Sequence, residues 1–99
     1  MKEIKFVWDE NKNRINQKKH KVSFEEAKTV FEDEEAIVFD DPEHSGGEER
    51  FLIIGFTSKA RLCIVSHCYR ENDSIIRLIS ARKATASERT YYNEENGGQ

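Results

Sequence analysis

Three strand-like segments that follow one another at short intervals constrain this chain more than any other feature. They run from Arg50 to Phe56, from Arg61 to Tyr69 and from Ser74 to Arg82, and apolar residues fill much of each. The separators, residues 57–60 and 70–73, hold four residues each. Four residues suffice for a hairpin, whereas parallel strands need a crossover of a dozen or more. We therefore expect a three-stranded antiparallel meander.

Two tight turns would also determine which side chains share a face of this sheet. Counting outward from the turns places Arg50 opposite His67, and His67 opposite Ile76. The first face would carry Arg50, His67, Ser80 and Arg82 with Leu52, Ile54, Val65 and Leu78. The second face would carry Arg77 with Phe51, Ile53, Leu62 and Ile64. A slip of one residue in either turn would reverse part of this assignment.

A polar helix is expected near the N-terminus. Asp9 is a good N-cap, and the helix should run to about Lys19. Its only aliphatic residue is Ile15, so it should lie on the surface with a thin contact stripe. It ends in the basic run 18–21, and cations are favourable at the negative pole of the helix dipole.

Two further helices and two short strands complete the expected elements. Ser23 and Glu26 form a capping-box pattern before an apolar face made of Phe24, Ala27, Val30 and Phe31. Thr85 and Glu88 form a second capping box, and the glycines at 97–98 would end that helix. Residues 4–8 and 36–39 are strand candidates, and residues 44–47 have the composition of a flexible loop. This arrangement predicts an α+β fold in a single domain spanning residues 1–99.

Composition limits the class of protein. The 16 Lys and Arg against 19 Asp and Glu give a net charge of -3 and a pI near 5.6, which argues against a protein that coats nucleic acid non-specifically. Many acids are segregated from the basic run 18–21, so a local cationic patch is still expected. No apolar run or N-terminal leader is evident, and Cys63 and Cys68 should point to opposite faces of one strand without bridging. We expect a reduced, cytoplasmic protein.

The candidate chemical groups are histidines and arginines. His20 could exchange a proton near neutral pH, or it could simply complement the helix dipole. His67 opposite Arg50 would form a base-plus-cation pair, or His67 could be a satisfied sheet histidine. Arg50, Arg77 and Arg82 could hold phosphate oxygens with their guanidinium forks, or each could pair with an acid such as Glu49 or Glu88.

Other kinds of site are less well supported. A zinc site built from Cys63, His67 and Cys68 fails on strand geometry, because Cys63 and His67 would be ~13 Å apart and Cys68 faces away. Tyr91 and Tyr92 could stack on bases, but they are better read as the core face of the last helix. Phosphate-binding glycine loops and nucleophile elbows are absent, so no metal or cofactor is expected.

Several segments together resemble BrnT-type toxins. They are residues 6–9 with Lys12 and Asn16, Lys19-His20 before the segment 22–27, the segment 48–51 with Gly55, the segment 77–84, and Tyr92. The resemblance spans roughly residues 4 to 93. At Lys21 the chain departs from the family, which usually has a glycine there that suits a left-handed turn.

The resemblance implies a RelE-like fold, in which two N-terminal helices and one C-terminal helix pack on an antiparallel sheet made of the meander and the N-terminal strands. It implies a ribonuclease toxin of a type II toxin–antitoxin system. The implied partner is a BrnA-type antitoxin with a ribbon-helix-helix region, through which the complex contacts operator DNA.

We expect this protein to cleave RNA without a metal, by attack of a ribose 2′-hydroxyl on the adjacent phosphate. His20 or His67 would act as base or acid, Arg50 and Arg82 would clamp the phosphate, and Lys19 and Arg77 would contact substrate. The alternative is a non-enzymatic module that binds RNA or protein and acts through its partner.

Overall fold

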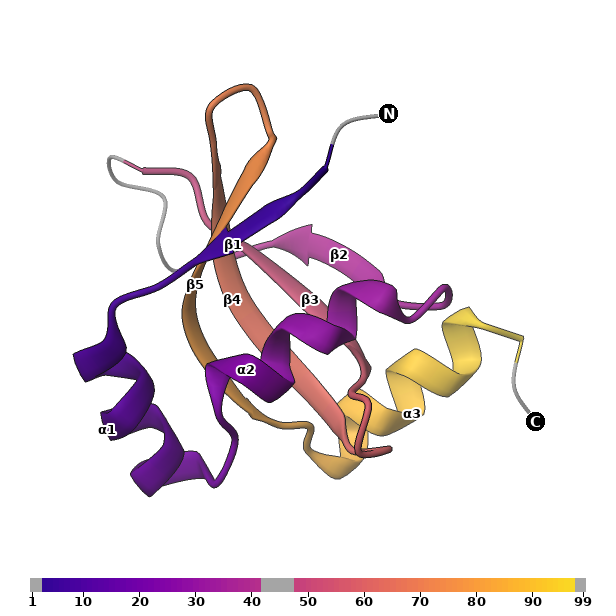
Figure 1. Ribbon diagram of the computed structural model, residues 1–99. Helices are drawn as coiled ribbons and strands as arrows, with labels where there is room; N and C mark the ends of the chain where they lie inside the picture. The colour runs from indigo at the N-terminus through magenta and orange to yellow at the C-terminus, as the bar shows by residue number, and fades with distance from the viewer. Residues whose placement is uncertain (1–2, 42–47, 98–99) are drawn as a thin grey trace.

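The computed structural model describes residues 3–41 and 48–97, which form a five-stranded sheet with helices on both faces (Figure 1). The strands lie in the order β1 (Lys5–Val7), β5 (Ile75–Lys83), β4 (Leu62–Arg70), β3 (Phe51–Phe56) and β2 (Ile37–Asp40). The antiparallel meander of β3, β4 and β5 is confirmed. The loop predicted at residues 44–47 lies outside the described residues.

The sheet is mixed, whereas a wholly antiparallel sheet was expected. β1 pairs with β5 in parallel, with Phe6 beside Ile76. A short turn can join only antiparallel strands, which is why the meander is antiparallel. Most of the chain separates β1 from β5, so these two strands can pair in parallel. The α+β class is confirmed, with one parallel strand at the edge.

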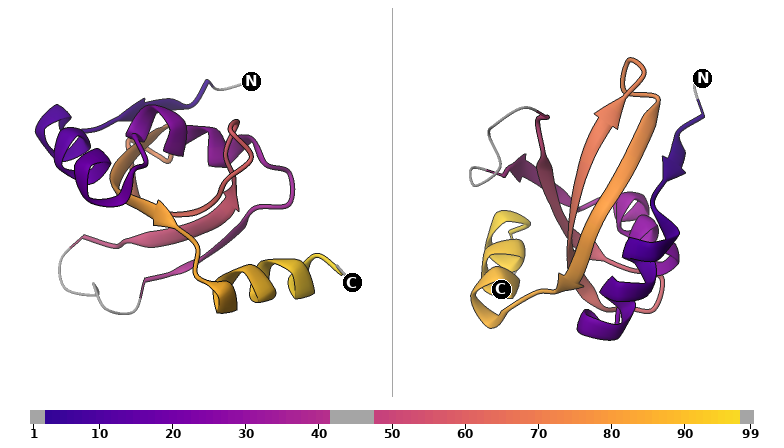
Figure 2. Two further views of the ribbon diagram at one scale, coloured as in Figure 1. Left: turned by 90° about the horizontal axis from the view of Figure 1, so that it is seen from below. Right: turned by 90° about the vertical axis from the view of Figure 1, so that its left-hand side faces the viewer.

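The helices cover the two faces unequally. α1 (Glu10–His20), α2 (Phe24–Ala27) and the 3₁₀ helix η1 (Lys28–Glu32) lie on one side, and α3 (Ala86–Glu95) lies on the other (Figure 2, right). The larger buried cluster joins α2 and η1 to the sheet through Phe24, Ala27, Val30, Ile53, Val65 and Leu78. The smaller cluster seats Tyr92 of α3 on Ile54, Leu62 and Ile64. None of these described helices is long and apolar enough to cross a membrane.

The expected helix starts are confirmed, with one difference in the second. The Asp9 carboxylate accepts from the amide of Asn11 at 2.8 Å, and Thr85 forms a reciprocal capping box with Glu88. The Ser23 hydroxyl accepts from the amide of Glu26 at 3.1 Å. The Glu26 carboxylate does not return this bond, because it is buried against Arg61 and Thr57.

α1 is held to the sheet by an asparagine side chain. β1 pairs with β5 only as far as Arg77, so the rest of that edge of β5 lacks a strand neighbour. The Asn16 amide fills this place: it donates to the Ala81 carbonyl at 2.9 Å and accepts from the Ala81 N–H at 3.0 Å. The same amide nitrogen donates to the Val22 carbonyl at 2.9 Å. A buried side chain thereby satisfies backbone groups that strand pairing leaves open.

The predicted register is wrong by one residue between β3 and β4 and by two between β4 and β5, where His67 lies opposite Leu78 and not Ile76. Phe51, and not Arg50, lies opposite His67, because the first hairpin loop holds five residues, 57–61. The second loop is 71–74, and a bulge between Ser66 and His67 shifts the pairing again. Each shift changes which residues of neighbouring strands lie opposite one another, and therefore which side chains share a face of the sheet.

The corrected register redistributes the candidate residues. Arg77, Ser80 and Arg82 lie opposite Cys68, Ser66 and Ile64, which are alternate residues of β4 and therefore face one way. This is the face that α3 covers in part, since Ile64 packs with Tyr92. His67 lies opposite Leu78 and faces the other way. The shared face of Ser80 and Arg82 was predicted correctly, but Arg77 belongs on that face and His67 does not.

The turn after α1 is left-handed, although Lys21 stands where the BrnT family usually has a glycine and could have favoured a different turn. Lys21 has φ 62° and ψ 26°, and its N–H donates to the Gln17 carbonyl at 2.9 Å. Its own carbonyl accepts from the Arg61 guanidinium at 2.9 Å. The lysine therefore adopts the backbone conformation that a glycine would adopt with less strain.

Replacing Asn16 by leucine should lower the free energy of unfolding by about 2–4 kcal/mol, because the buried backbone groups of Ala81 would lose their partner. The matched control is Ile15→Ala at the neighbouring, 58% exposed position, which should change stability by about 0.5 kcal/mol or less. Chemical denaturation monitored by circular dichroism measures both. Equal effects in the two variants would contradict the role given to Asn16.

Lys21→Gly should raise the free energy of unfolding by about 0.5–1 kcal/mol. Relief of about 1–2 kcal/mol of left-handed strain outweighs the extra chain entropy of glycine. Lys28→Gly is the control, because Lys28 caps α2 in the right-handed region with φ -64°, and glycine there should lower stability. Thermal unfolding of both variants gives the comparison, and a destabilised Lys21→Gly protein would contradict the strain argument.

Candidate active site

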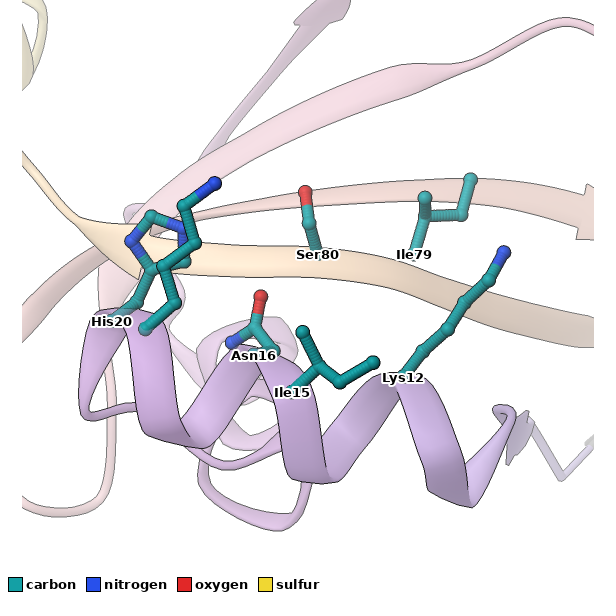
Figure 3. A pocket seen from close by; sticks show the side chains of 7 residues that line it. Lys12, Ile15, Asn16, His20, Ile79 and Ser80 are labelled. Atoms are coloured by element: carbon teal, nitrogen blue, oxygen red, sulfur yellow. The ribbon is translucent and has the colours of Figure 1, made fainter.

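A basic pocket of about 220 Å³ lies between α1 and the edge of β5. α1 contributes Lys12, Ile15, Asn16, Lys19 and His20, and β5 contributes Ile79 and Ser80. Figure 3 shows the Ser80 and Ile79 side chains rising from the strand beside those of the helix, with His20 and Lys12 at opposite ends. The pocket thus combines a histidine, two lysines, a hydroxyl and two aliphatic side chains.

Helical spacing and the Asn16 contact create this pocket. Residues 12, 16 and 19 follow the i, i+4, i+7 pattern that places side chains on one face of a helix. Asn16 binds Ala81, so it holds this face against the neighbouring strand residue Ser80. Ser80 follows the bulge in β5 and is exposed. The buried amide therefore sets the position of the whole pocket.

The cations of the pocket carry free charge. Among the described residues, neither Lys12 nor Lys19 forms an ion pair, whereas Arg61, Arg70 and Arg82 each pair with a carboxylate. Both lysines are exposed, and His20 is half-buried at the end of α1. The pocket can therefore attract an anion and offer it hydrogen-bond donors and an imidazole.

His67 is far less accessible than His20. Its side chain has no solvent exposure, and it packs against Phe31 and Tyr69 with ring centroids 4.9 and 5.2 Å away. Its Nδ1 lies 3.2 Å from the Val65 carbonyl and its Nε2 lies 3.2 Å from the Tyr69 hydroxyl. Burial lowers the pKa of His67 and favours the neutral ring. These contacts are those of a satisfied core histidine.

Arg82 forms an ion pair with Glu88, which was the expected alternative to phosphate binding. Its two terminal nitrogens donate to the two Glu88 carboxylate oxygens, each at 2.9 Å. Glu88 also accepts from the Thr85 N–H at 2.8 Å, so the pair joins β5 to the start of α3. The Arg82 hydrogen bonds hold the pKa of Glu88 down at about 2. The Arg82 side chain is 40% exposed, but its charge is largely neutralised within the protein.

The structure does not bring Arg50 to His67 or to the pocket. Arg50 precedes β3, and its carbonyl accepts from the Asp41 N–H at 3.2 Å. Arg77 shares the face of Ser80 but lies beyond the bulge and beside Val7 of β1. Neither guanidinium forms an ion pair with a described carboxylate.

The remaining predicted groups behave as structural residues. Cys63 and Cys68 are buried free thiols, as expected, and burial raises the pKa of Cys63 to about 11. Within residues 3–41 and 48–97, no three His, Cys, Asp or Glu side chains are arranged to hold a metal ion. Tyr92 is buried and its hydroxyl donates to Asp33 at 2.7 Å, whereas Tyr91 is 40% exposed. Only one of the two tyrosines thus belongs to the core.

Sequence reasoning did not assign Lys12 and Ser80 to the site. The helical spacing of Lys12, Lys19 and His20 was a usable signal, because it places Lys12 on the same side of α1. Ser80 was expected on the face of Arg82, but its place beside α1 had no comparable signal, since it depends on the bulge in β5 and on the Asn16 contact.

The architecture is that of a known ribonuclease toxin. The crystal structure of the Brucella abortus ribonuclease toxin BrnT superposes with a TM-score of 0.63 at 24% sequence identity, covering 83% of this chain and 97% of that one. The family model described as the ribonuclease toxin BrnT of type II toxin–antitoxin systems matches residues 8–88. The chain therefore belongs to the BrnT family of ribonuclease toxins. Comparison with curated protein sequences gives no match.

Glu88→Gln should remove an acid-sensitive part of the stability. The pKa of Glu88 is lowered from 4.5 to about 2 in the folded protein, so its contribution is complete above the unfolded value and is lost as pH falls from about 4.5 towards 2. We expect the variant to lose about 1–2 kcal/mol at neutral pH, less than the full shift implies because Arg82 is partly exposed. The difference from the native protein should narrow as pH falls through this window. Urea unfolding at several pH values measures it, and a constant difference would contradict the assignment.

Proposed function

We propose that this BrnT toxin is an endoribonuclease that cleaves RNA without a metal ion, through the pocket between α1 and β5. The observation that carries the proposal is the meeting, at an accessible strand edge, of His20 with Lys12 and Lys19, which form no ion pair with a described carboxylate. An RNA phosphate carries the negative charge that complements the two lysines, and the ribose 2′-hydroxyl beside it is the nucleophile. The family match independently supports RNA as the substrate.

The proposed reaction is an intramolecular phosphoryl transfer. His20 takes the proton of a ribose 2′-hydroxyl, and the oxygen forms a bond to the adjacent phosphorus. Lys19 and the Ser80 hydroxyl stabilise the added negative charge on the phosphorane. The bond from phosphorus to the 5′-oxygen breaks, and Lys12 protonates the leaving oxygen. The products are a 2′,3′-cyclic phosphate and a 5′-hydroxyl, and solvent restores both proton-transfer groups.

The arrangement of the pocket supports these assignments. An in-line displacement requires the base and the acid on opposite sides of the phosphorus. His20 and Lys12 lie at opposite ends of the pocket (Figure 3), with Ser80 between them on the neighbouring strand. Ile15 and Ile79 offer apolar surface against which a nucleobase can pack.

The other predicted residues have secondary places in the proposal. His67 has no exposed surface, so we leave it out of the proton transfer. Arg77 and Arg82 lie on the Ser80 face and are candidate contacts for the RNA on either side of the cut, with Arg82 the weaker because Glu88 neutralises it. Arg50 would contact only a part of the RNA remote from the pocket.

Membership of a type II system calls for a protein antitoxin. We propose that a BrnA-like antitoxin with a ribbon-helix-helix region neutralises the toxin, and that the complex contacts operator DNA through the antitoxin. Co-purification of the two proteins, followed by a shift assay with operator DNA, tests this partnership apart from the chemistry.

His20→Ala should lower the rate of RNA cleavage by about 10²–10⁴-fold, the usual contribution of a positioned proton-transfer group. Lys19→Ala should also be slowed, whereas Lys28→Ala, which removes an exposed cation outside the pocket, should cleave normally. The assay incubates partner-free protein in EDTA with a defined RNA and its DNA counterpart, and end-group analysis identifies the products. Circular dichroism establishes that each variant is folded.

RNA-only cleavage with 2′,3′-cyclic phosphate ends is the expected result. Full activity of folded His20→Ala would exclude His20 as the base. Cleavage of the DNA, or of RNA in which each 2′-hydroxyl is replaced, would exclude 2′-hydroxyl attack. If free RNA is not cut, repeating the assay on translating ribosomes distinguishes a ribosome-dependent nuclease from a non-enzymatic binding module.

A further inference from the structure

A second cationic surface lies on α1, outside the pocket. Arg14, Gln17, Lys18 and Lys21 line a shallow hollow of about 470 Å³. Arg14 and Lys18 are one turn apart on α1, and Lys21 follows in the left-handed turn that ends the helix. We call these four residues the outer row.

The cations of the outer row have no carboxylate partner among the described residues. Among the described residues, its three cations form no ion pair, and Arg14 makes only a hydrogen bond to the amide oxygen of Asn11. All four side chains are exposed. Arg61, Arg70 and Arg82 are each neutralised by a described carboxylate, whereas the outer row keeps its positive charge in a protein whose net charge is -3.

We propose that the outer row binds the sugar–phosphate backbone of the RNA substrate beyond the cleavage pocket. This inference rests on the proposed function, because it extends the site that cuts the RNA. Lys18 and Lys21 neighbour Lys19 and His20 in the chain, so the C-terminal end of α1 carries cations of both the pocket and the outer row.

The composition of the outer row favours nucleic acid over a protein partner. Stable protein interfaces depend on buried aromatic or aliphatic anchors, and the outer row has none. Contacts to phosphate need only positive charge and donors, and they carry no sequence information. The outer row should therefore raise affinity for RNA of any sequence and leave the choice of cleavage site to the pocket.

The test compares Arg14→Gln/Lys18→Gln with Lys5→Gln/Lys28→Gln, a control pair of exposed cations that changes the net charge equally. The probe is 2′-O-methyl RNA, which retains its phosphates but cannot be cut by 2′-hydroxyl attack. Fluorescence anisotropy measures the affinity for a short oligonucleotide that fills only the pocket and for one several times longer. Circular dichroism verifies the folding of both double variants.

We expect the outer-row variant to bind the long RNA about 10- to 30-fold more weakly near 0.1 M salt, and the slope of log K against log salt to fall by about 1.4, or 0.7 for each lost contact. Its affinity for the short RNA should not change, and the control pair should bind both RNAs normally. Equal weakening in the two double variants would overturn the proposal by showing an effect of net charge alone. Unchanged binding of the long RNA, or weaker binding only to the antitoxin, would also overturn it.

The binding result and the cleavage result can fail separately. A native protein that binds the long RNA through the outer row but cuts neither free RNA nor RNA on translating ribosomes would refute the proposed chemistry and leave the binding surface standing. A native protein that cuts RNA while the outer-row variant binds and cuts long RNA normally would refute the binding surface alone.

Discussion

The contact between the Asn16 amide and the backbone of Ala81 is the interaction on which the arrangement of this molecule depends. β1 leaves β5 after Arg77, and α1 takes its place without supplying an apolar stripe. The paired hydrogen bonds satisfy the strand edge, and a third bond to Val22 ties the turn after the helix to the same amide. Because buried backbone groups are costly to leave unpaired, this one side chain determines where α1 lies.

Asparagine side chains attach α1 to the rest of the protein, so its charged side chains are available to bind other molecules. Asn13 supports Asn16 by accepting from the Phe24 N–H at 2.8 Å, so the buried positions of the helix are both neutral. The lysines and the arginine of α1 then lie on its flanks and need no internal partner. In contrast, Glu26 and Glu88 neutralise Arg61 and Arg82, which join loops and helices to the sheet. Some cations of the described residues thus form structural pairs with carboxylates, whereas those on and just after α1 do not.

The sequence predicted the parts of this fold that depend on local chemistry. Asp9, Ser23 and Thr85 begin helices as expected, and the spacing of the last three strands correctly predicted a meander. The pairing of Arg50 with His67 failed because the first hairpin loop holds one extra residue, Arg61, and the bulge changes only the pairing of β4 with β5. The Asn16 contact spans 65 residues of sequence and has no periodic signature, so neither the edge it fills nor the place of Ser80 could be derived from spacing.

Free charge on α1 is also compatible with stability. Lys18, Lys19 and His20 occupy its last turn, where the negative pole of the helix dipole favours positive charge. The same residues face the pocket and the outer row, so the electrostatic demand of the fold and that of an anionic substrate have the same sign. The acids are mostly placed elsewhere in the chain, and solvent ions screen them over about 8–10 Å. A protein with a net charge of -3 can therefore present a positive surface to RNA without weakening the helix that carries it.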